Sequence, residues 1–93
     1  MSNGERSGKS WRVILVSSAK KQLQRIPVKD RERIANAMDT LEENPWSGDI
    51  DKLGGDEISW RRRIGNYRIL FDIFSAEKII YVNEIKRRTS STY

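Results

Sequence analysis

The order of apolar and polar positions predicts a strand followed by two helices. Residues 11–17 (WRVILVS) are a β-branched run that is apolar on both faces, which is typical of a buried strand. Residues 18–26 (SAKKQLQRI) fit a short helix, with Ser17 or Ser18 as its N-cap and Pro27 ending it. The chain therefore enters its first helix directly from its first strand.

A second, longer helix is predicted over residues 28–43. Its apolar positions recur at helical spacing, and its other face alternates in charge sign. The apolar residues of this stripe are Ile34, Met38 and Leu41, with Ala35 and Ala37 beside them. Asn44-Pro45 ends the helix, and the short junction at Pro27 predicts a helical hairpin.

Three more strands are predicted after a loop. Residues 45–57 are rich in Gly, Pro, Asp and Ser and indicate a loop, which Trp46 and Leu53 are expected to fix to the core. The strands cover residues 57–64, 67–74 and 78–88, and Gly65-Asn66 suits a type II′ turn. The predicted fold class is α+β: an N-terminal strand, a helical hairpin and a three-stranded antiparallel meander, forming one sheet with the helices on one face.

Composition limits the domain organisation and the chemistry. The 93 residues suit one domain over 11–93, after a disordered tail over residues 1–10 that lacks the apolar region of a signal peptide. Without cysteine or histidine, the chain has no disulfide, no thiolate metal site and no histidine base. No apolar run is long enough to span a membrane, so we expect a cytoplasmic protein without metal or cofactor.

The net charge of +5 is unevenly distributed. Residues 1–26 carry six cations and one anion, residues 27–56 four cations and eight anions, and residues 57–93 eight cations and four anions. Basic ends around an acidic middle are typical of a positive face for nucleic acid, although ordinary solubilising surface is an alternative.

The predicted hairpin brings arginines together. A two-residue turn at Gly65-Asn66 places Arg63 opposite Arg68 and Arg61 opposite Leu70. Because strand side chains alternate, one face of the hairpin holds Ser59, Arg61, Arg63, Arg68 and Leu70, and the other holds Trp60, Ile64, Tyr67, Ile69, Phe71 and Ile73. Arg62 falls within the apolar set, where a bulge or an extended side chain at the sheet rim could accommodate it.

Two interpretations of these arginines remain open. Asp72, Glu57 or an acidic loop residue could neutralise them. Alternatively, they form a phosphate-binding surface, since guanidinium groups match phosphate geometry and stay charged. The chain end adds Lys86, Arg87, Arg88 and Tyr93 to this surface, a combination that suits phosphate pairing and base stacking in single-stranded RNA.

The segments KLGG, WRRRIGNYRILF and IKRRTSSTY, in this order after the helical hairpin, resemble the RelE/ParE superfamily of type II toxin–antitoxin toxins, and the RelE-like branch in particular. The resemblance extends from Trp11 to Tyr93. It implies a metal-independent endonuclease that cuts mRNA on the ribosome by attack of a ribose 2′-OH on the adjacent phosphate. The implied partners are a cognate antitoxin, the ribosome and mRNA, with operator DNA reached only through the antitoxin.

The resemblance also implies roles for individual residues. Arg68 matches a phosphate-stabilising arginine, Arg87 an arginine acting at the leaving group, and Tyr93 a tyrosine that orients the nucleotide. Arg61 stands where a catalytic lysine is often found. The implied RNA-binding residues are Arg63, Lys86 and Arg88.

Two departures from the family pattern concern the base. Ser59 replaces a second lysine, and a guanidinium such as that of Arg61 is a poor base, so the general base stays unassigned. Two other functions remain open: a ParE-like toxin that poisons DNA gyrase by binding, and a non-catalytic RNA-binding module.

Overall fold

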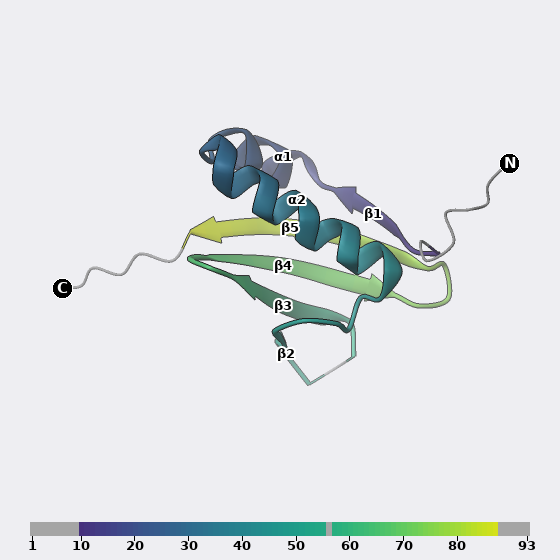
Figure 1. Ribbon diagram of the computed structural model, residues 1–93. Coiled ribbons are helices and arrows are strands. Elements are labelled where there is room, and N and C mark those ends of the chain that lie inside the picture. Colours follow the sequence, from purple (N-terminus) through teal and green to yellow (C-terminus); the bar gives the residue numbers. More distant parts are fainter. Residues whose placement is uncertain (1–9, 56, 88–93) are drawn as a thin grey trace, which may run out of the picture.

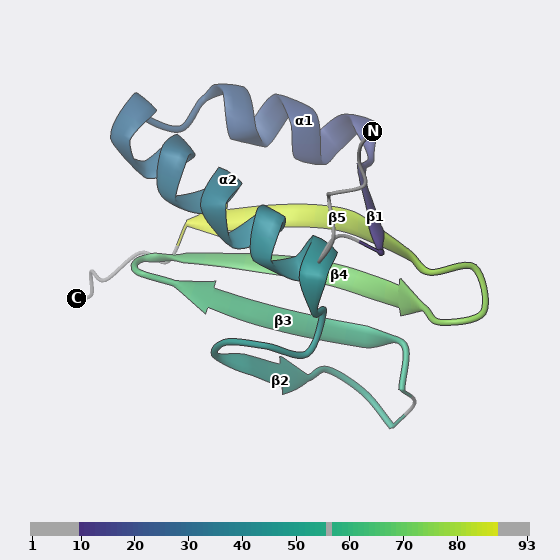
Figure 2. The same cartoon turned by 45° about the vertical axis from the view of Figure 1, so that its right-hand side comes forward.

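Two helices cover one face of a five-stranded sheet in the computed structural model, which describes residues 10–55 and 57–87 (Figure 1). Both helices lie on the same side of the sheet when the molecule is turned (Figure 2). The elements are β1 (Arg12–Leu15), α1 (Ser17–Gln24), α2 (Val28–Glu43), β2 (Ile50–Lys52), β3 (Ser59–Ile64), β4 (Tyr67–Phe74) and β5 (Ile79–Arg87). The α+β prediction is confirmed. Residues 1–9 of the predicted tail lie outside the described residues.

The sheet has the strand order β1-β5-β4-β3-β2. β1 pairs in parallel with β5, and the other neighbours are antiparallel. β1 is therefore an edge strand, and the expectation that both of its faces are buried is wrong. Val13 and Leu15 pack against the core, whereas Ile14 aligns with Tyr81, a residue outside the core cluster.

The core lies between α2 and the central strands. Alternate residues of β4 are buried, as the hairpin pattern predicted, and Phe71 is only 1% exposed. They pack in one cluster with Ile34, Met38 and Leu41, which the helical spacing also predicted. Burying these side chains supplies most of the driving force for folding. Ala37 is buried as well, whereas Ala35 is exposed.

The first helix begins without the expected serine cap. Its N-cap is Val16, and no side chain caps the helix. Ser17 is already the first helical residue, and the Ser18 hydroxyl donates a 3.5 Å hydrogen bond to the carbonyl of Asn83 in β5. Neither serine caps the helix, because only Val16 separates the end of β1 from the helix and both serines lie within it.

The segment predicted as a loop contains a fifth strand. β2 pairs with β3, and Ile50 packs against the core. Trp46 and Leu53, expected to fix this segment, are instead 46% and 42% exposed. Trp46 meets the Trp11 ring edge-on at 5.4 Å between centroids. The segment is therefore anchored by Pro45, which is fully buried, and by Ile50.

A β-bulge in β5 reverses which of its side chains face the helices and which face the uncovered side of the sheet. Leu70 pairs with Glu84, but Phe71 pairs with Val82, so Asn83 is an extra residue in β5. The Asn83 amide donates a 3.0 Å hydrogen bond to the Asp72 carboxylate, which fixes the extra residue. Beyond the bulge Ile85 points into the core. Residues after Ile85 consequently face the opposite way from those of an uninterrupted strand.

Neither helix of the described residues is long and apolar enough to cross a membrane.

Candidate functional site

Four cations lie on the sheet face that the helices leave uncovered. The predicted register is confirmed: Arg63 pairs with Arg68, and Arg61 with Leu70. On the other side of β4, Arg68 pairs with Lys86. Since Tyr67 and Ile69 point into the core, alternation places Arg68 on the opposite face. We call the set Arg61, Arg63, Arg68 and Lys86 the basic face.

The turn between β3 and β4 holds these strands together. Gly65 has a φ of +56°, and Asn66 is not among the residues with positive φ. A positive φ at the first central position alone fits the predicted type II′ turn. Only this tight connection allows Arg63 and Arg68 to lie directly opposite each other, an arrangement of like charges that destabilises the strand pair.

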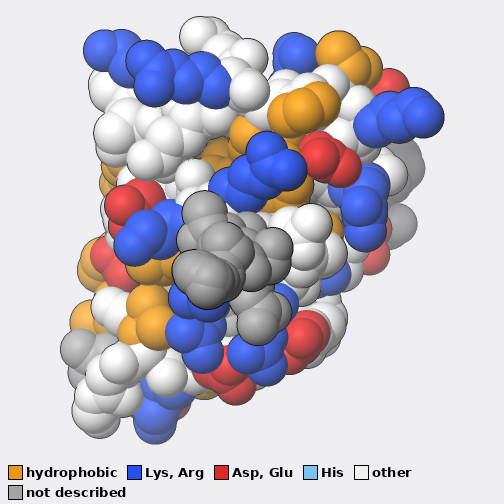
Figure 3. All heavy atoms as spheres, turned by 90° about the vertical axis from the view of Figure 1, so that its left-hand side faces the viewer, with side chains coloured by type: hydrophobic (Ala, Val, Ile, Leu, Met, Phe, Trp, Pro, Cys, Tyr) orange, Lys and Arg blue, Asp and Glu red, His pale blue; other side chains and the backbone are white. Residues whose placement is uncertain are grey.

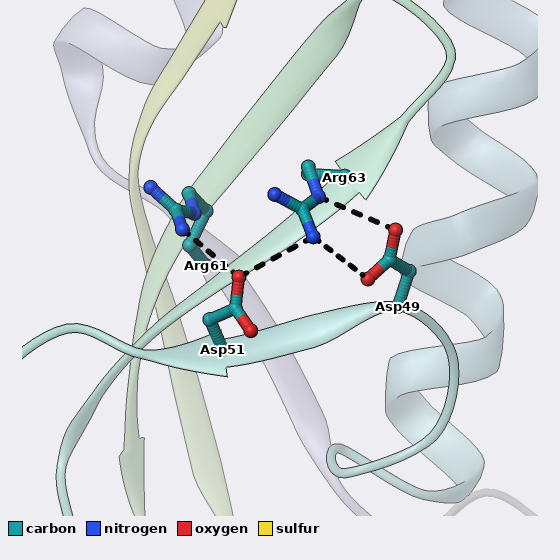
Figure 4. Close-up of polar contacts among 4 residues, drawn as sticks. All are labelled: Asp49, Asp51, Arg61 and Arg63. Atoms are coloured by element: carbon teal, nitrogen blue, oxygen red, sulfur yellow. Dashed lines mark hydrogen bonds and ion pairs between the residues drawn. The ribbon is translucent and has the colours of Figure 1, made fainter.

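Two carboxylates of the β2 region neutralise part of the basic face. Arg61 Nη2 lies 2.9 Å from Asp51 Oδ2. Arg63 contacts Asp49 through Nε at 3.3 Å and Nη2 at 3.4 Å, and its Nη2 lies 3.5 Å from Asp51 Oδ2 (Figure 4). The interpretation that an acidic residue of the loop partners these arginines is confirmed for Arg61 and Arg63. Glu57 and Asp72 instead contact Lys52 and Ser59.

These contacts shift the ionisation of both partners. The hydrogen bond from Arg61 and the charge of Arg63 lower the pKa of Asp51, and Asp49 raises the pKa of Arg63. A carboxyl whose pKa is lower in the folded state stabilises the fold above its ordinary pKa, and this stabilisation is lost as the pH falls through the folded value. At neutral pH Asp51 is therefore ionised. Because the Asp51 and Arg63 side chains are largely exposed, solvent screens the ion pair and its contribution to stability is small.

Arg68 differs from its two neighbours. It is half-buried, and within residues 10–55 and 57–87 its side chain makes no hydrogen bond or ion pair. Its cross-strand neighbours are the cations Arg63 and Lys86. An unneutralised guanidinium between two further cations is a favourable place for a phosphate group.

Arg62 lies on the covered side of the sheet, where sequence reasoning gave two explanations. β3 pairs continuously with β4 through this position, so no bulge is involved. Gly48, with a φ of +85°, makes room instead: a Cβ there would lie 2.6 Å from Arg62 Cζ. The Nε and Nη1 atoms of Arg62 are buried without a hydrogen-bond partner in the described chain. Burial accordingly lowers the pKa of Arg62.

Arg87 does not join the basic face, contrary to our expectation. It pairs with Tyr67, and its guanidinium carbon lies 6.0 Å from the centre of the Tyr67 ring. Tyr67 belongs to the core side, where its hydroxyl donates a 3.1 Å hydrogen bond to Asp30, and burial raises its pKa. The bulge at Asn83 causes this reversal, since it turns Lys86 rather than Arg87 toward Arg68. Arg87 instead lines a pocket of about 250 Å³ between α1 and β5.

The end of the molecule that carries the β3–β4 turn is rich in charge. Figure 3 shows Lys and Arg side chains in several groups across it, with Asp and Glu among them. The remaining two predicted site residues, Arg88 and Tyr93, lie outside the described residues. The catalytic and RNA-binding roles of all seven residues stay predictions.

Sequence reasoning missed Asp49 and Asp51 as members of the site. The alternation Asp49-Ile50-Asp51 is a period-two signal that could have identified a strand with two acids on one face. The surrounding Gly and Pro concealed it. For the bulge at Asn83 we find no comparable signal in the sequence.

Comparison with known proteins agrees with this architecture. The family model of the ParE toxin of type II toxin–antitoxin system, parDE, matches residues 13–91. A protein from Methanocaldococcus jannaschii, provisionally named toxin RelE1, is 30% identical over 71 residues, which cover 73% of this chain and 79% of that protein. The chain belongs to the RelE/ParE superfamily of type II toxin–antitoxin toxins.

Solved structures place this toxin on the RelE-like side of the superfamily. The archaeal RelE–RelB complex from Pyrococcus horikoshii OT3 contains a chain that is 28% identical, with a TM-score of 0.77 over 87% of this chain and 98% of that one. The isolated E. coli RelE toxin also has a TM-score of 0.77, over 88% of each chain, and at 15% identity it shares the fold alone. The predicted superfamily and its RelE-like branch are thereby confirmed.

Proposed function

We propose that this toxin is a ribosome-dependent mRNA endonuclease that inhibits translation. The observation that carries the proposal is Arg68, whose guanidinium lies between Arg63 and Lys86 and is not neutralised by any acid of the described residues. Folding does not require this arrangement, since like charges on neighbouring strands are destabilising. The similarity to RelE proteins supports the same function.

The proposed chemistry is electrostatic. The oxygen of a ribose 2′-OH bonds to the adjacent phosphorus and the P–O5′ bond breaks. The hydroxyl gives up its proton, the departing 5′-oxygen takes one up, and a 2′,3′-cyclic phosphate remains on the upstream fragment. Arg68 and Lys86 stabilise the extra negative charge that develops on the phosphate oxygens in the transition state. Arginine is a poor proton acceptor, so these cations leave the base unassigned. We propose that the ribosome holds the RNA in the reactive geometry, because orientation alone contributes a large part of such a rate.

A second candidate is a toxin that poisons DNA gyrase by binding. The observation in its favour is the family model, which is described as the ParE toxin of the parDE system. The basic face would then contact an acidic protein surface or DNA. Cleavage of mRNA distinguishes the two functions.

We expect purified toxin to cut mRNA on programmed ribosomes and largely to spare the same RNA when it is naked. In parallel, gyrase supercoiling of a plasmid should continue at its normal rate in the presence of the toxin. The measurement is primer extension on the mRNA beside an agarose-gel supercoiling assay. Intact ribosomal mRNA together with inhibited supercoiling would replace our proposal with the gyrase function.

We also propose that a cognate antitoxin covers the basic face. Solved structures similar to this chain include complexes of RelE with RelB from two archaea. Half-buried apolar residues share the uncovered sheet face with the cations: Ile14, Leu70, Phe74, Ile79 and Tyr81. A partner segment that is apolar on one part and acidic on another would match both regions.

Co-expression tests the partner. We expect a stable complex in which ribosomal cleavage is lost, with the solvent accessibility of Arg68 and Lys86 reduced in a footprinting experiment. A purified complex that cleaved ribosomal mRNA at the rate of free toxin would contradict the proposed arrangement.

A further inference from the structure

A single carboxylate oxygen joins two arginines of the basic face. Asp51 Oδ2 lies 2.9 Å from Arg61 Nη2 and 3.5 Å from Arg63 Nη2 (Figure 4). Asp49 holds Arg63 from the other side through two contacts. The two arginines therefore have a fixed position relative to each other, which the hairpin alone would not give to such long side chains.

The backbone fixes the position of this carboxylate. Asp51 is paired with Arg61 in the β2–β3 ladder, and the amide of Arg63 donates a 2.9 Å hydrogen bond to the carbonyl of Asp49. Between the two acids, Ile50 packs against the core on the opposite side of the strand. Alternation over residues 49–51 thus directs both carboxylates to the basic face, while Ile50 between them secures the strand.

Arg61 is held by Asp51 at one terminal nitrogen, which leaves its other terminal nitrogen for a ligand. Its side chain is 27% exposed, and its Nε is buried without a partner in the described chain. One terminal nitrogen contacts Asp51, and the other points away from it (Figure 4). A guanidinium held at one terminal nitrogen presents the other in a defined direction, because the group is planar.

We infer that Asp51 is a positioning residue, which orients Arg61 and Arg63 for the RNA phosphate that Arg68 and Lys86 attract. The inference rests on the proposed function. Asp51 does not touch the RNA, and its negative charge weakens RNA binding. The orientation of two guanidinium groups compensates for this by accelerating cleavage. Asp51 therefore has opposite effects on affinity and on rate.

This opposition gives a specific test with Asp51→Asn. Cleavage of mRNA on programmed ribosomes, measured in single turnover, is expected to fall by about tenfold or more, since misplaced catalytic groups have effects of this size. Affinity for a single-stranded RNA oligonucleotide is expected to rise. The released arginines should also steepen the salt dependence of binding, by about 0.7 in the logarithmic slope for each added phosphate contact.

Two further variants test whether the effect comes only from the lost negative charge and whether Asp51 acts through Arg61. Glu77→Gln removes the same charge from the exposed β4–β5 turn and should leave cleavage and the salt slope unchanged. In an Arg61→Ala background, Asp51→Asn should lower cleavage much less than it does in the wild type. Non-additivity of this kind indicates that Asp51 acts through Arg61.

Each other outcome overturns the inference. If Asp51→Asn raised both affinity and cleavage, Asp51 would only inhibit the site. If it lowered both together with the melting temperature, its role would be structural. If the wild type cut ribosomal mRNA and Asp51→Asn cut it at the same rate, the positioning role would be refuted and the proposed endonuclease function would stand. A wild type that cut no ribosomal mRNA would refute the proposed function and the inference with it.

Discussion

Replacing Arg68 by alanine should abolish most mRNA cleavage without unfolding the toxin. Removing one preorganised donor from a charge-stabilising site commonly lowers the rate by about 10²- to 10³-fold. Arg68 lies opposite Arg63 and Lys86, so its loss also relieves repulsion across the strands. That relief is worth a few tenths of a kcal/mol to about 1 kcal/mol. The melting temperature should therefore be unchanged or slightly higher.

Melting temperature and single-turnover cleavage should be measured on the same Arg68→Ala preparation. Arg12→Ala is a matched control, because Arg12 is exposed on the edge strand β1 and pairs with Ile79, at the opposite end of β5 from Lys86. It removes the same charge and should leave cleavage intact. A large fall in melting temperature with normal cleavage by the folded fraction would mean that Arg68 is structural.

Replacing Phe71 by alanine should cause the largest loss of stability. Phe71 is on β4, near the middle of the sheet, and is 1% exposed within the core cluster. Truncating a buried phenylalanine typically destabilises a protein by about 3–5 kcal/mol, through lost burial and the cavity that remains. Small domains are stable by only about 5–15 kcal/mol in total. We expect a large part of the variant to unfold at 37 °C, as measured by urea titration.

Phe74→Ala provides the comparison within the same strand. Phe74 is half-buried on the uncovered face, where its ring meets Tyr81 edge-on at 5.6 Å between centroids. Losing that contact and partial burial should destabilise the protein by about 1 kcal/mol. Equal effects of the two substitutions would contradict the assignment of the core to the helix side.

The sequence predicted those parts of the fold that depend on regular spacing. The stripe of Ile34, Met38 and Leu41 located the core face of α2, and alternation located that of β4. A two-residue turn fixes the register of its hairpin by geometry, so the pairing of Arg63 with Arg68 could be predicted.

The sequence did not predict the β-bulge, which depends on one extra residue in a strand, or the short strand β2. One extra residue, Asn83, reverses the direction of every side chain beyond it, so Lys86 rather than Arg87 reaches the basic face. The three-residue strand β2 is held by tertiary pairing with β3, because so short a run has little preference of its own. Asp51 within this strand and Asp49 just before it were consequently expected only as unspecified loop partners.

The parallel pairing of β1 with β5 has a consequence for synthesis of the chain. β1 is made before every other described element, yet its partner β5 is the last of the described strands to be made. β5 also lies between β1 and β4, so the sheet cannot close before it arrives. Contacts of such high contact order slow folding. The nascent chain therefore cannot complete the basic face until β5, which supplies Lys86 beside Arg68, has been made.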